Sequence, residues 1–330
     1  MNDEFFMDLA FKEAFKYMLL TYPNPSVGAV VVKDGKILAI EAHKKAGLAH
    51  AEVNALIKAY NTLTSSSINF NEDAKKSHQF LLSLPKDFFK DCEIYITLEP
   101  CSHIGKTPSC ANLLKELKLK RVVIGSLDPI KSHSGGVDIL KSVSKVDIGV
   151  LKDRCDILIE PFKIWQKRGF VLFKLAQTTN GRIGGGYISS KESLTHTHKL
   201  REICTKLVIG GNTVRVDRPT LNCRFTSNYA PDIVIYSKDN NFDKTIPLFS
   251  VPNREVKITN NLDFLNKKGF YLIEGGEGML KALQKKIDWM LIYQAPKLNC
   301  NQISYNIDSN LEFIHTIQNK DLIIWSRFSG

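Results

Sequence analysis

The fold of the first half of the chain is decided by TLEPCSHIGKTPSC, residues 97–110. This stretch begins in an apolar, β-branched segment predicted as a strand at 93–98, which Glu99-Pro100 terminates. It ends where helical spacing predicts a helix at 111–119, and a second buried-type strand is predicted at 121–125. A strand, a helix and a further strand in this order predict an α/β fold with a crossover connection.

Two cysteines at the ends of this loop combine with a histidine upstream. His50 opens a helix predicted at 50–60, Cys101 follows the strand, and Cys110 precedes the next helix. One imidazole and two thiolates, with a fourth position left for water, are the ligand set of a catalytic zinc. Zinc lowers the pKa of its bound water to about 7, so hydroxide is available at neutral pH. The sequence therefore predicts one Zn²⁺ per chain, held by these three residues.

Glu52 lies two residues after the predicted zinc histidine. A carboxylate there can accept the proton of the water and pass it to a leaving group, so we predict Glu52 as the catalytic acid and base rather than a ligand. Zinc deaminases carry this pattern as H-x-E followed by P-C-x-x-C, whereas eight residues separate the cysteines here. His103 is not expected to be a ligand, because His50 already supplies the imidazole.

The remaining elements of the first half flank this motif. A helix is predicted at 4–20, where two prolines end it, and a hairpin is predicted from strands at 27–32 and 37–40. Residues 61–90 are polar and poorly periodic, and we interpret them as an inserted, solvated loop.

The pattern changes near residue 150, so we predict domains at 1–150 and 151–330, with a charged connector at 151–168. A second alternation of strands and helices follows the connector, without an internal repeat. Its predicted strands are 170–176, 206–210, 232–236, 270–274 and 289–293, and its predicted helices are 191–204 and 278–286. The length of 330 residues also favours two α/β domains, since one core is filled by roughly 100–200 residues.

The composition limits the partners and the compartment. The 45 basic and 34 acidic residues give a net charge of +11, which favours anionic partners such as nucleic acid or phosphorylated small molecules. Seven cysteines in a chain of this length do not indicate a disulfide framework, and a reducing compartment fits them better. The N-terminal residues lack the pattern of a signal peptide, and no run approaches the roughly 20 apolar residues of a spanning helix. We therefore predict a cytoplasmic protein without a membrane partner.

Three motifs of the first half are PNPSVG at 23–28, HAEVNAL at 50–56 and the stretch 97–110. Together they resemble the family of bifunctional riboflavin-biosynthesis deaminase–reductases, and the long cysteine spacing around SHIGKTP is specific to that family. The resemblance implies a cytidine-deaminase-like zinc domain. Its reaction would be the hydrolytic deamination of 2,5-diamino-6-(5-phosphoribosylamino)pyrimidin-4(3H)-one. The resemblance also implies that Asn24 and His43 line the substrate pocket.

The second half lacks the G-x-G-x-x-G dinucleotide fingerprint, but LIEGGEGM at 272–279 joins a predicted strand to a predicted helix through a glycine loop. Such a loop lets backbone amides approach a phosphate. With LAQTTNGR at 175–182 and GGNTVRVDRPTL at 210–221, it resembles the reductase domain of the same family. The resemblance implies a dihydrofolate-reductase-like fold and NADPH as cofactor. The implied reaction delivers hydride to C1′ of the opened ribose of 5-amino-6-(5-phosphoribosylamino)uracil, which gives the ribitylamino product.

The resemblance also implies roles for individual residues of the second half. The implied cofactor-binding residues are Ala176, Thr213, Asp217, Gly276, Glu277, Gly278, Met279, Leu280, Lys281 and Ala282. The implied substrate-binding residues are Lys174, Arg201, Leu221, Arg224 and Glu274. The arginines suit a phosphate because guanidinium binds it in a bidentate manner. Two features depart from the family, since Arg218 stands where an aspartate is frequent and residues 184–186 are all glycine.

The residues alone leave other functions open. A nucleic-acid or nucleotide deaminase with a non-catalytic second domain would use the positive charge, but the sequence around His50 and Cys101 lacks the basic and aromatic residues that base flipping uses. A structural zinc would need four protein ligands instead of three. A chain with only one active half is a third alternative. The expected partner is the phosphorylated pyrimidine ribotide and not nucleic acid, and the oligomeric state, a homo-oligomer included, is left open.

Overall fold

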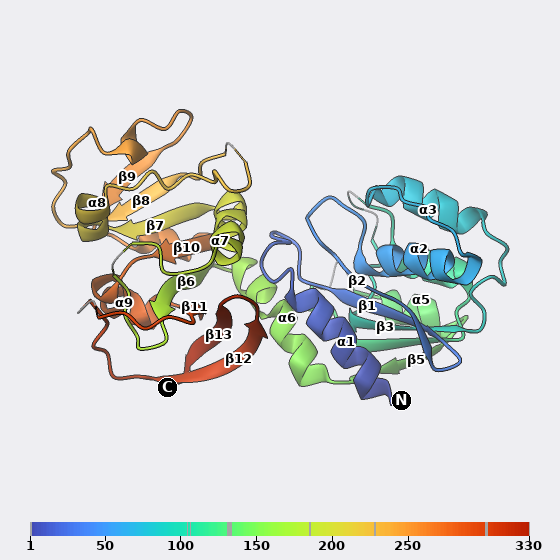
Figure 1. Ribbon diagram of the computed structural model, residues 1–330. Coiled ribbons are helices and arrows are strands. Elements are labelled where there is room, and N and C mark those ends of the chain that lie inside the picture. The colour runs from blue at the N-terminus through green and yellow to red at the C-terminus, as the bar shows by residue number, and fades with distance from the viewer. Residues whose placement is uncertain are drawn as a thin grey trace. The chain divides into compact units, whose positions relative to one another are not determined.

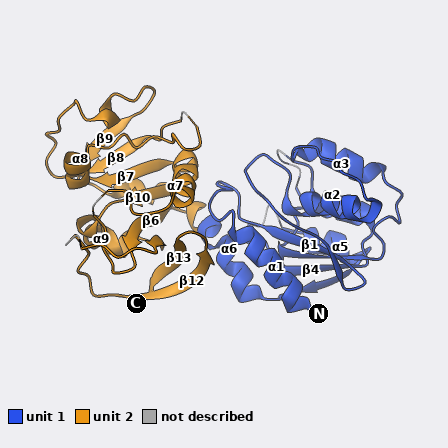
Figure 2. Ribbon diagram, in the orientation of Figure 1, with its two compact units in different colours: residues 1–163 blue, residues 164–330 orange. Residues whose placement is uncertain are grey.

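The computed structural model describes residues 2–103, 105, 107–130, 134–184, 186–227, 229–300 and 303–329. The chain forms two compact units, residues 1–163 and 164–330 (Figures 1 and 2). This division lies later than the predicted boundary near 150, because most of helix α6 (Lys152–Trp165) packs with the first unit. Cys155 of α6 is buried against residues of helix α1, and Arg154 forms an ion pair with Asp8. Membrane crossing needs a long apolar helix, and the described part of the chain contains none.

The first unit is built on a five-stranded sheet in the order β2-β1-β3-β4-β5. Its strands are β1 (Gly28–Lys33), β2 (Lys36–Ala42), β3 (Cys92–Leu98), β4 (Arg121–Ser126) and β5 (Lys145–Ile148). The predicted hairpin is confirmed, since Asp34 and Gly35 have φ of 48° and 75°, the left-handed conformation that a tight hairpin turn requires. Strands β3, β4 and β5 are parallel, and their carboxyl ends therefore lie at one edge of the sheet.

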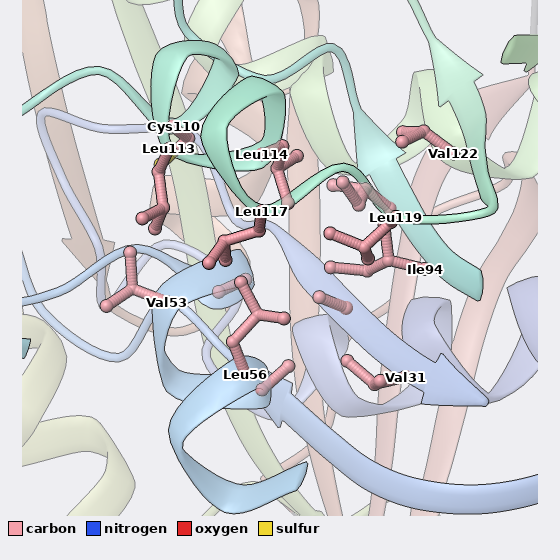
Figure 3. Packing of buried hydrophobic residues seen from close by; sticks show 14 of the residues in the cluster. Val31, Val53, Leu56, Ile94, Cys110, Leu113, Leu114, Leu117, Leu119 and Val122 are labelled. Atoms are coloured by element: carbon pink, nitrogen blue, oxygen red, sulfur yellow. The ribbon is translucent and has the colours of Figure 1, made fainter. Parts of the chain in front are cut away.

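Helices cover both faces of this sheet (Figure 1). They are α1 (Asp3–Phe15), α2 (Ala51–Thr64), α3 (Ala74–Ser83), α4 (Cys110–Leu117), α5 (Gly136–Lys141) and α6. Alternate residues of a strand point to opposite faces, so Val30 packs with α1 and Val31 with the side of α2 and α4. In Figure 3, Val53 and Leu56 of α2 lie near Leu117 of α4 in this second layer. The apolar core therefore anchors α2, which follows His50 and carries Glu52, and α4, which begins at Cys110.

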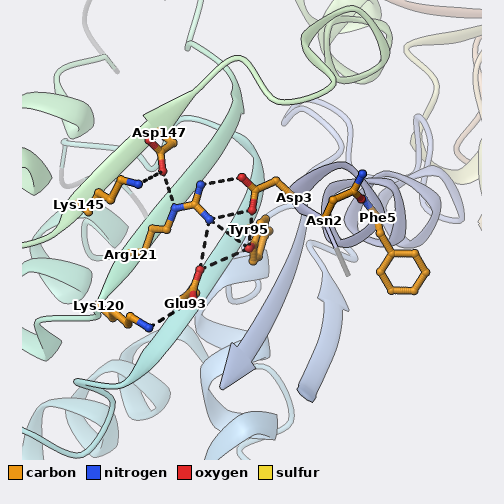
Figure 4. A network of polar contacts seen from close by, with 9 residues as sticks. All are labelled: Asn2, Asp3, Phe5, Glu93, Tyr95, Lys120, Arg121, Lys145 and Asp147. Atoms are coloured by element: carbon orange, nitrogen blue, oxygen red, sulfur yellow. Dashed lines mark hydrogen bonds and ion pairs between the residues drawn. The ribbon is translucent and has the colours of Figure 1, made fainter. Parts of the chain in front are cut away.

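The opposite edge of the sheet is tied together by ion pairs around Arg121 at the start of β4 (Figure 4). Arg121 donates from both terminal nitrogens to Asp3 of α1, at 2.7 Å each, and it also contacts Asp147 of β5 and Glu93 of β3. The hydrogen bond from Arg121 lowers the pKa of Asp3. This network joins α1 to three parallel strands at the end remote from the cysteine loop, where it stabilises the sheet.

The insertion at 61–90 is not only a loop, because it contains helix α3. Asp73 caps this helix by accepting a hydrogen bond from the Lys76 amide at 3.0 Å, and Leu81 is buried. The aromatic rings of Phe80 and Phe88 lie 4.9 and 5.2 Å from that of Tyr60 on α2. The helix is short and its apolar residues are few, so periodicity alone did not identify it. Helix α5 and strand β5 were likewise not predicted.

The second unit is built on an eight-stranded sheet in the order β12-β13-β11-β6-β10-β7-β8-β9. Its strands are β6 (Gly169–Thr178), β7 (Lys206–Gly210), β8 (Ile233–Tyr236), β9 (Val256–Thr259), β10 (Gly269–Glu274), β11 (Trp289–Ala295), β12 (Asn310–Gln318) and β13 (Leu322–Ser329). Its α-helices are α7 (Lys191–Ile203), α8 (Gly211–Asp217) and α9 (Glu277–Leu283). The five predicted strands and both predicted helices are present. Strands β9, β12 and β13 and helix α8 were not predicted.

Six strands of this sheet, from β11 to β9, are parallel, and β12 and β13 form an antiparallel hairpin beside β11. Trp325 of β13 is buried with its ring 6.2 Å from that of Trp289, so the C-terminal hairpin completes the core of this unit. Strand β12 is mostly exposed and shows no clear alternation of burial, which explains why its sequence was not recognised as a strand.

Candidate metal centre and ligand sites

The three predicted metal ligands lie together in the first unit. His50 is the residue before α2, Cys101 follows β3, and Cys110 is the first residue of α4. The Nδ1 atom of His50 lies 3.4 Å from Sγ of Cys110 and 3.7 Å from Sγ of Cys101. All three ligand atoms lie within 4.8 Å of one another. A nitrogen and two sulfurs at this separation fit a tetrahedral zinc that keeps one position open.

The loop between the cysteines closes on itself through hydrogen bonds. The Ser109 hydroxyl donates to the Cys101 carbonyl at 2.8 Å and accepts from the Asn112 amide at 3.2 Å, which caps α4. The Cys110 amide donates to Sγ of Cys101 at 3.4 Å. The thiols therefore meet although eight residues separate them. Ile104 and Lys106 of this loop lie outside the described residues.

Thr107 holds the outer nitrogen of the metal histidine. Its Oγ1 lies 3.2 Å from Nε2 of His50, while Nδ1 of the same ring faces the two sulfurs. A metal-binding nitrogen must offer a lone pair, so the ring proton resides on Nε2 and is donated to the Thr107 hydroxyl. Such a contact fixes the ring orientation of a metal ligand. We did not predict this role for Thr107, although the residue is part of the quoted motif.

Glu52 lies in the first turn of α2 and is buried, with 4% of its surface exposed. Burial raises the pKa of its carboxyl group, because the charged form loses the solvation of water. The pKa of the Cys101 thiol is lowered by the hydrogen bond from Cys110 and by His50, which favours the thiolate that binds metal. The site thus places a carboxyl group with a raised pKa beside the Cys101 thiolate.

A cavity of about 310 Å³ opens at this centre. His50, Cys101 and Glu52 line it, together with the predicted substrate residues Asn24 and His43. The structure therefore brings together the residues predicted for the deaminase pocket. His103 also lines the cavity but is not part of the ligand group found among the described residues.

His43 is buried, and its hydrogen bonds define its tautomer. Its Nδ1 lies 3.2 Å from the Ala49 carbonyl, which can only accept, so Nδ1 carries the proton. Its Nε2 lies 3.1 Å from Nδ2 of Asn24 and accepts from that amide. Burial and the neighbouring His50 lower the pKa of His43 to about 4, so the ring is neutral at physiological pH.

Two further residues of the pocket were not predicted. The buried carboxylate of Glu99 accepts hydrogen bonds from the backbone amides of Asp128, Gly135 and Val137, at 3.1, 3.0 and 3.1 Å. It thereby holds the loop after β4, whose Asp128 lines the cavity. Phe162 of α6 contributes an apolar wall. The position of Glu99 within the quoted motif was its only sequence signal.

In the second unit, three predicted substrate residues form a charged cluster. Lys174 of β6 lies opposite Glu274 of β10 in the parallel register. Arg201 of α7 donates two hydrogen bonds, of 2.6 and 2.8 Å, to the Glu274 carboxylate. Burial opposes ionisation of Glu274, but the charge of Arg201 lowers its pKa to about 2. Burial lowers the pKa of Lys174.

Leu221 and Arg224, the other predicted substrate residues, lie on the loop after α8. Leu221 is buried, and Arg254 donates to its carbonyl and, at 2.7 Å, to that of Thr220. Arg224 is exposed and contacts the Tyr187 hydroxyl. The described contacts of Arg224 therefore do not place it in the cluster of Arg201 and Glu274.

The predicted cofactor residues lie at the carboxyl ends of neighbouring parallel strands, where open α/β sheets bind ligands. Ala176 is near the end of β6, Thr213 and Asp217 are on α8 after β7, and residues 276–282 follow β10. The side chain of Met279 lies between Gly210, just before α8, and Gly275, just before α9. A Cβ atom at Gly210 or Gly275 would lie 2.7 Å from Met279 Cγ, so a larger residue at either position would displace the Met279 side chain.

The side chains of the predicted cofactor residues differ in exposure. Those of Met279 and Leu280 are buried in the core, so these two could reach a cofactor only through their backbone. Asp217, Gly278, Lys281 and Ala282 are exposed, and Ala176, Thr213, Gly276 and Glu277 are partly exposed. The Arg218 guanidinium donates hydrogen bonds to the Asp243 carboxylate at 2.7 Å and to the Thr245 hydroxyl at 2.6 Å. Gly185 of the glycine run lies outside the described residues.

Comparisons with protein families match both halves of the chain. Residues 1–126 match the family described as cytidine and deoxycytidylate deaminase zinc-binding region, and residues 170–299 match the family described as RibD C-terminal domain. The riboflavin biosynthesis protein RibD of Aquifex aeolicus is 33% identical over 337 residues, which cover 90% of this chain and 87% of that protein. RibD of Actinobacillus pleuropneumoniae is 32% identical over 240 residues, covering 70% of this chain and 57% of that protein.

Solved structures match over the whole length. A diaminohydroxyphosphoribosylaminopyrimidine deaminase/5-amino-6-(5-phosphoribosylamino)uracil reductase from Thermotoga maritima has a TM-score of 0.68 at 25% identity, covering 99% of each chain. Acinetobacter baumannii RibD has a TM-score of 0.66 at 25% identity, again covering 99% of each chain.

Proposed function

The chain belongs to the family of bifunctional riboflavin-biosynthesis deaminase–reductases, and we propose from that premise which of its residues perform each reaction. The predicted two-domain α/β fold class is confirmed, with a cytidine-deaminase-like zinc domain followed by a RibD-type reductase domain. A dihydrofolate-reductase-like fold of the second domain is part of the proposal. The enzyme deaminates the diaminopyrimidinone ribotide and then reduces the resulting phosphoribosylaminouracil with NADPH to the ribitylamino product.

The deaminase assignment is carried by one observation. The buried Glu52 lines a cavity with His50 and Cys101, two members of the His50, Cys101 and Cys110 ligand set. Bound zinc supplies the Lewis acidity that makes water a nucleophile at neutral pH. Glu52 takes up the proton of the attacking water and transfers it to the amino group that leaves as ammonia. Its raised pKa suits this role, because a carboxyl group whose pKa lies above its ordinary value holds a transferred proton more readily.

Asn24 and His43 bind the pyrimidine ring in this assignment. His43 is neutral, with its proton directed to the Ala49 carbonyl, so it adds no charge that would compete with the metal centre. Its hydrogen bond with Asn24 orients the amide of that residue at the cavity wall. Uncharged groups in defined orientations suit a heterocyclic ring with fixed donors and acceptors.

For the reductase, Lys174, Arg201 and Glu274 would bind the substrate at the carboxyl ends of β6 and β10. NADPH, when bound, would supply the hydride that reduces C1′ of the opened ribose. Arg201 and Glu274 orient one another through their two hydrogen bonds, so both side chains are held before substrate arrives. The loop 276–282 offers backbone amides to the cofactor phosphates. Leu221 and Arg224, on the loop after α8, are proposed to bind the substrate too, although the described hydrogen bonds of Arg224 go to Asn222 and Tyr187.

A nucleic-acid deaminase is not favoured, because residues 170–299 match the reductase domain of the same family. We place both reactions in the cytoplasm, where NADPH and reduced thiols are present. All seven cysteines lie among the described residues, and none of them forms a disulfide.

A coupled assay tests the proposal. The purified, zinc-loaded protein should release ammonia from the diaminopyrimidinone ribotide and then oxidise NADPH. Failure of ammonia release would remove the deaminase assignment, and failure to oxidise NADPH with the deaminated intermediate supplied directly would remove the reductase assignment.

A further inference from the structure

The wall of the deaminase cavity includes a loop at 43–49 between β2 and the metal histidine. His43, Ala46 and Gly47 of this loop line the cavity. The other side of the loop is contacted by the inserted segment, at a turn formed by residues 70–73 just before α3. We call residues 70–73 the insertion turn.

Two contacts join the insertion turn to the loop, and both are made by Glu72. The Glu72 carbonyl accepts a hydrogen bond from the Ala49 amide at 2.8 Å. The Glu72 carboxylate forms an ion pair with Lys44 at 2.7 Å, where the two side chains are 26% and 31% exposed. One residue of the insertion therefore holds both ends of the cavity loop.

The contact with Ala49 continues to the predicted substrate residue. The Ala49 carbonyl accepts from Nδ1 of His43 at 3.2 Å and from Nδ2 of Asn54 at 3.3 Å. The Ala49 amide thus donates to Glu72, and the Ala49 carbonyl accepts from His43. A shift of this backbone would move the acceptor that defines the orientation of the His43 ring.

The backbone of the insertion turn is unusual for a glutamate. Asn71 and Glu72 have φ of 50° and 61°, and the Asp73 amide donates to the Phe70 carbonyl at 3.0 Å. A tight turn with two left-handed residues favours glycine or asparagine at both positions. Glutamate suits such a position poorly on conformational grounds, so its side chain is explained by the contact with Lys44 and not by the turn.

We propose that Glu72 is a positioning residue of the deaminase, which holds the cavity loop through Lys44 and Ala49 and thereby orients His43 toward the pyrimidine ring. The inference rests on the proposed function, through the role of His43. The proposal assigns the insertion at 61–90 a role in deamination and none in reduction.

Glu72→Gly provides the test, because glycine suits the left-handed turn and keeps the carbonyl that accepts from Ala49. We expect the KM for deamination to rise about threefold to tenfold with kcat nearly unchanged, since a partly exposed ion pair contributes modestly. The melting temperature should be unchanged or higher. Lys44→Met should reproduce the rise, and the double variant should be no worse than either single one, because both remove the same contact.

Lys58→Met is the matched control. Lys58 pairs with Glu41 at 3.0 Å, as Lys44 does at 3.3 Å, but Lys58 has no described contact with Glu72 or the cavity loop. Its KM for deamination should equal that of the wild type. Reduction of the deaminated intermediate should be unaffected in all these variants.

A readout without turnover comes from equilibrium binding of the diaminopyrimidinone ribotide to Glu52→Gln and to Glu52→Gln/Glu72→Gly, where the second should bind more weakly by the same factor. An unchanged KM in Glu72→Gly, or additive effects in the double variant, would overturn the proposal. Loss of zinc from Glu72→Gly would overturn it too, because the effect would then arise at the metal and not at His43. Absence of ammonia release by the wild type would instead reject the proposed function itself.

Discussion

The two thiols of the metal centre in the first unit are brought together by one short loop, whereas the charged cluster of the second unit depends on strand register and on the packing of α7. Cys101 and Cys110 meet because the loop between them closes through its own hydrogen bonds. Arg201 and Glu274 are 73 residues apart and meet only because α7 packs beside β10. The cysteine pair could be predicted from its motif, whereas the contact between Arg201 and Glu274 could not be predicted from either segment alone.

The sharpest test of this comparison is Glu52→Gln, which should stop one reaction and leave the other intact. The amide cannot carry the proton, so ammonia release should fall by about 10²–10⁴-fold. Zinc content should stay at one ion per chain, and reduction of the deaminated intermediate should proceed at the wild-type rate. Retained ammonia release with zinc bound would reject the role of Glu52.

Glu274→Gln should affect the second unit alone. It leaves the buried guanidinium of Arg201 without a counter-charge, which should destabilise that unit by about 3–5 kcal/mol in urea unfolding and impair reduction. Glu255→Gln is the control, because the Glu255 side chain is 63% exposed in its ion pair with Lys206 and its loss should hardly matter. Equal effects of the two substitutions would show that the cluster is no more than a surface ion pair.

The same pair predicts how acid affects the second unit. The pKa of Glu274 lies near 2 in the folded protein against 4.5 for an ordinary glutamate, so its stabilisation is complete above about pH 4.5. As the pH falls from there towards 2, at most about 3 kcal/mol should be lost. Urea unfolding at a series of pH values should show this loss in the wild type and not in Glu274→Gln. Parallel pH profiles of the two proteins would contradict the assignment.

The smallest expected effect concerns the support of the metal histidine. Thr107→Val removes the acceptor of the His50 Nε2 proton while keeping the shape of the side chain. Zinc affinity, measured by competition with a chelator, should fall about 10–100-fold. Thr64→Val serves as control, since the Thr64 hydroxyl bonds only within its own helix end, to the Tyr60 carbonyl and Ser66. An unchanged affinity in Thr107→Val would mean that the loop orients His50 without this contact.

Much of the fold could be predicted because strands and helices with strong periodicity are local features. The hairpin of β1 and β2, the strand β3 and the parallel strands β6, β10 and β11 all follow from runs of apolar residues. The helix α3 escaped prediction because its packing against Tyr60 depends on partners outside its own sequence. Strand β12 escaped it because an exposed edge strand carries little alternation.

The candidate sites likewise contain residues that the sequence predicted and contacts that it did not. His50, Glu52, Cys101 and Cys110 were predicted from residue type and order. The first three line one cavity, and the ligand atom of Cys110 lies within 4.8 Å of those of His50 and Cys101. The supporting contacts of Thr107, Glu99 and Glu72 were not predicted, because each serves a backbone or ring far from it in the sequence or across a loop. In the second unit, the resemblance indicated Arg201 and Glu274 but not that they bind each other.

The amino-acid sequence by itself determined the chemistry of this protein: an imidazole, two thiols and a carboxylic acid in the order of a zinc deaminase, followed by the loops of a reductase. The tertiary structure alone decided which groups are in contact and where the insertion contacts the cavity loop. It also decided how burial and neighbouring charges shift the pKa values of Glu52, His43 and Glu274. The physical reason is the separation along the chain of the residues that interact. Residue type and local spacing are carried by neighbours in the chain, whereas distance, burial and electrostatic coupling depend on strand register and packing between segments remote in sequence.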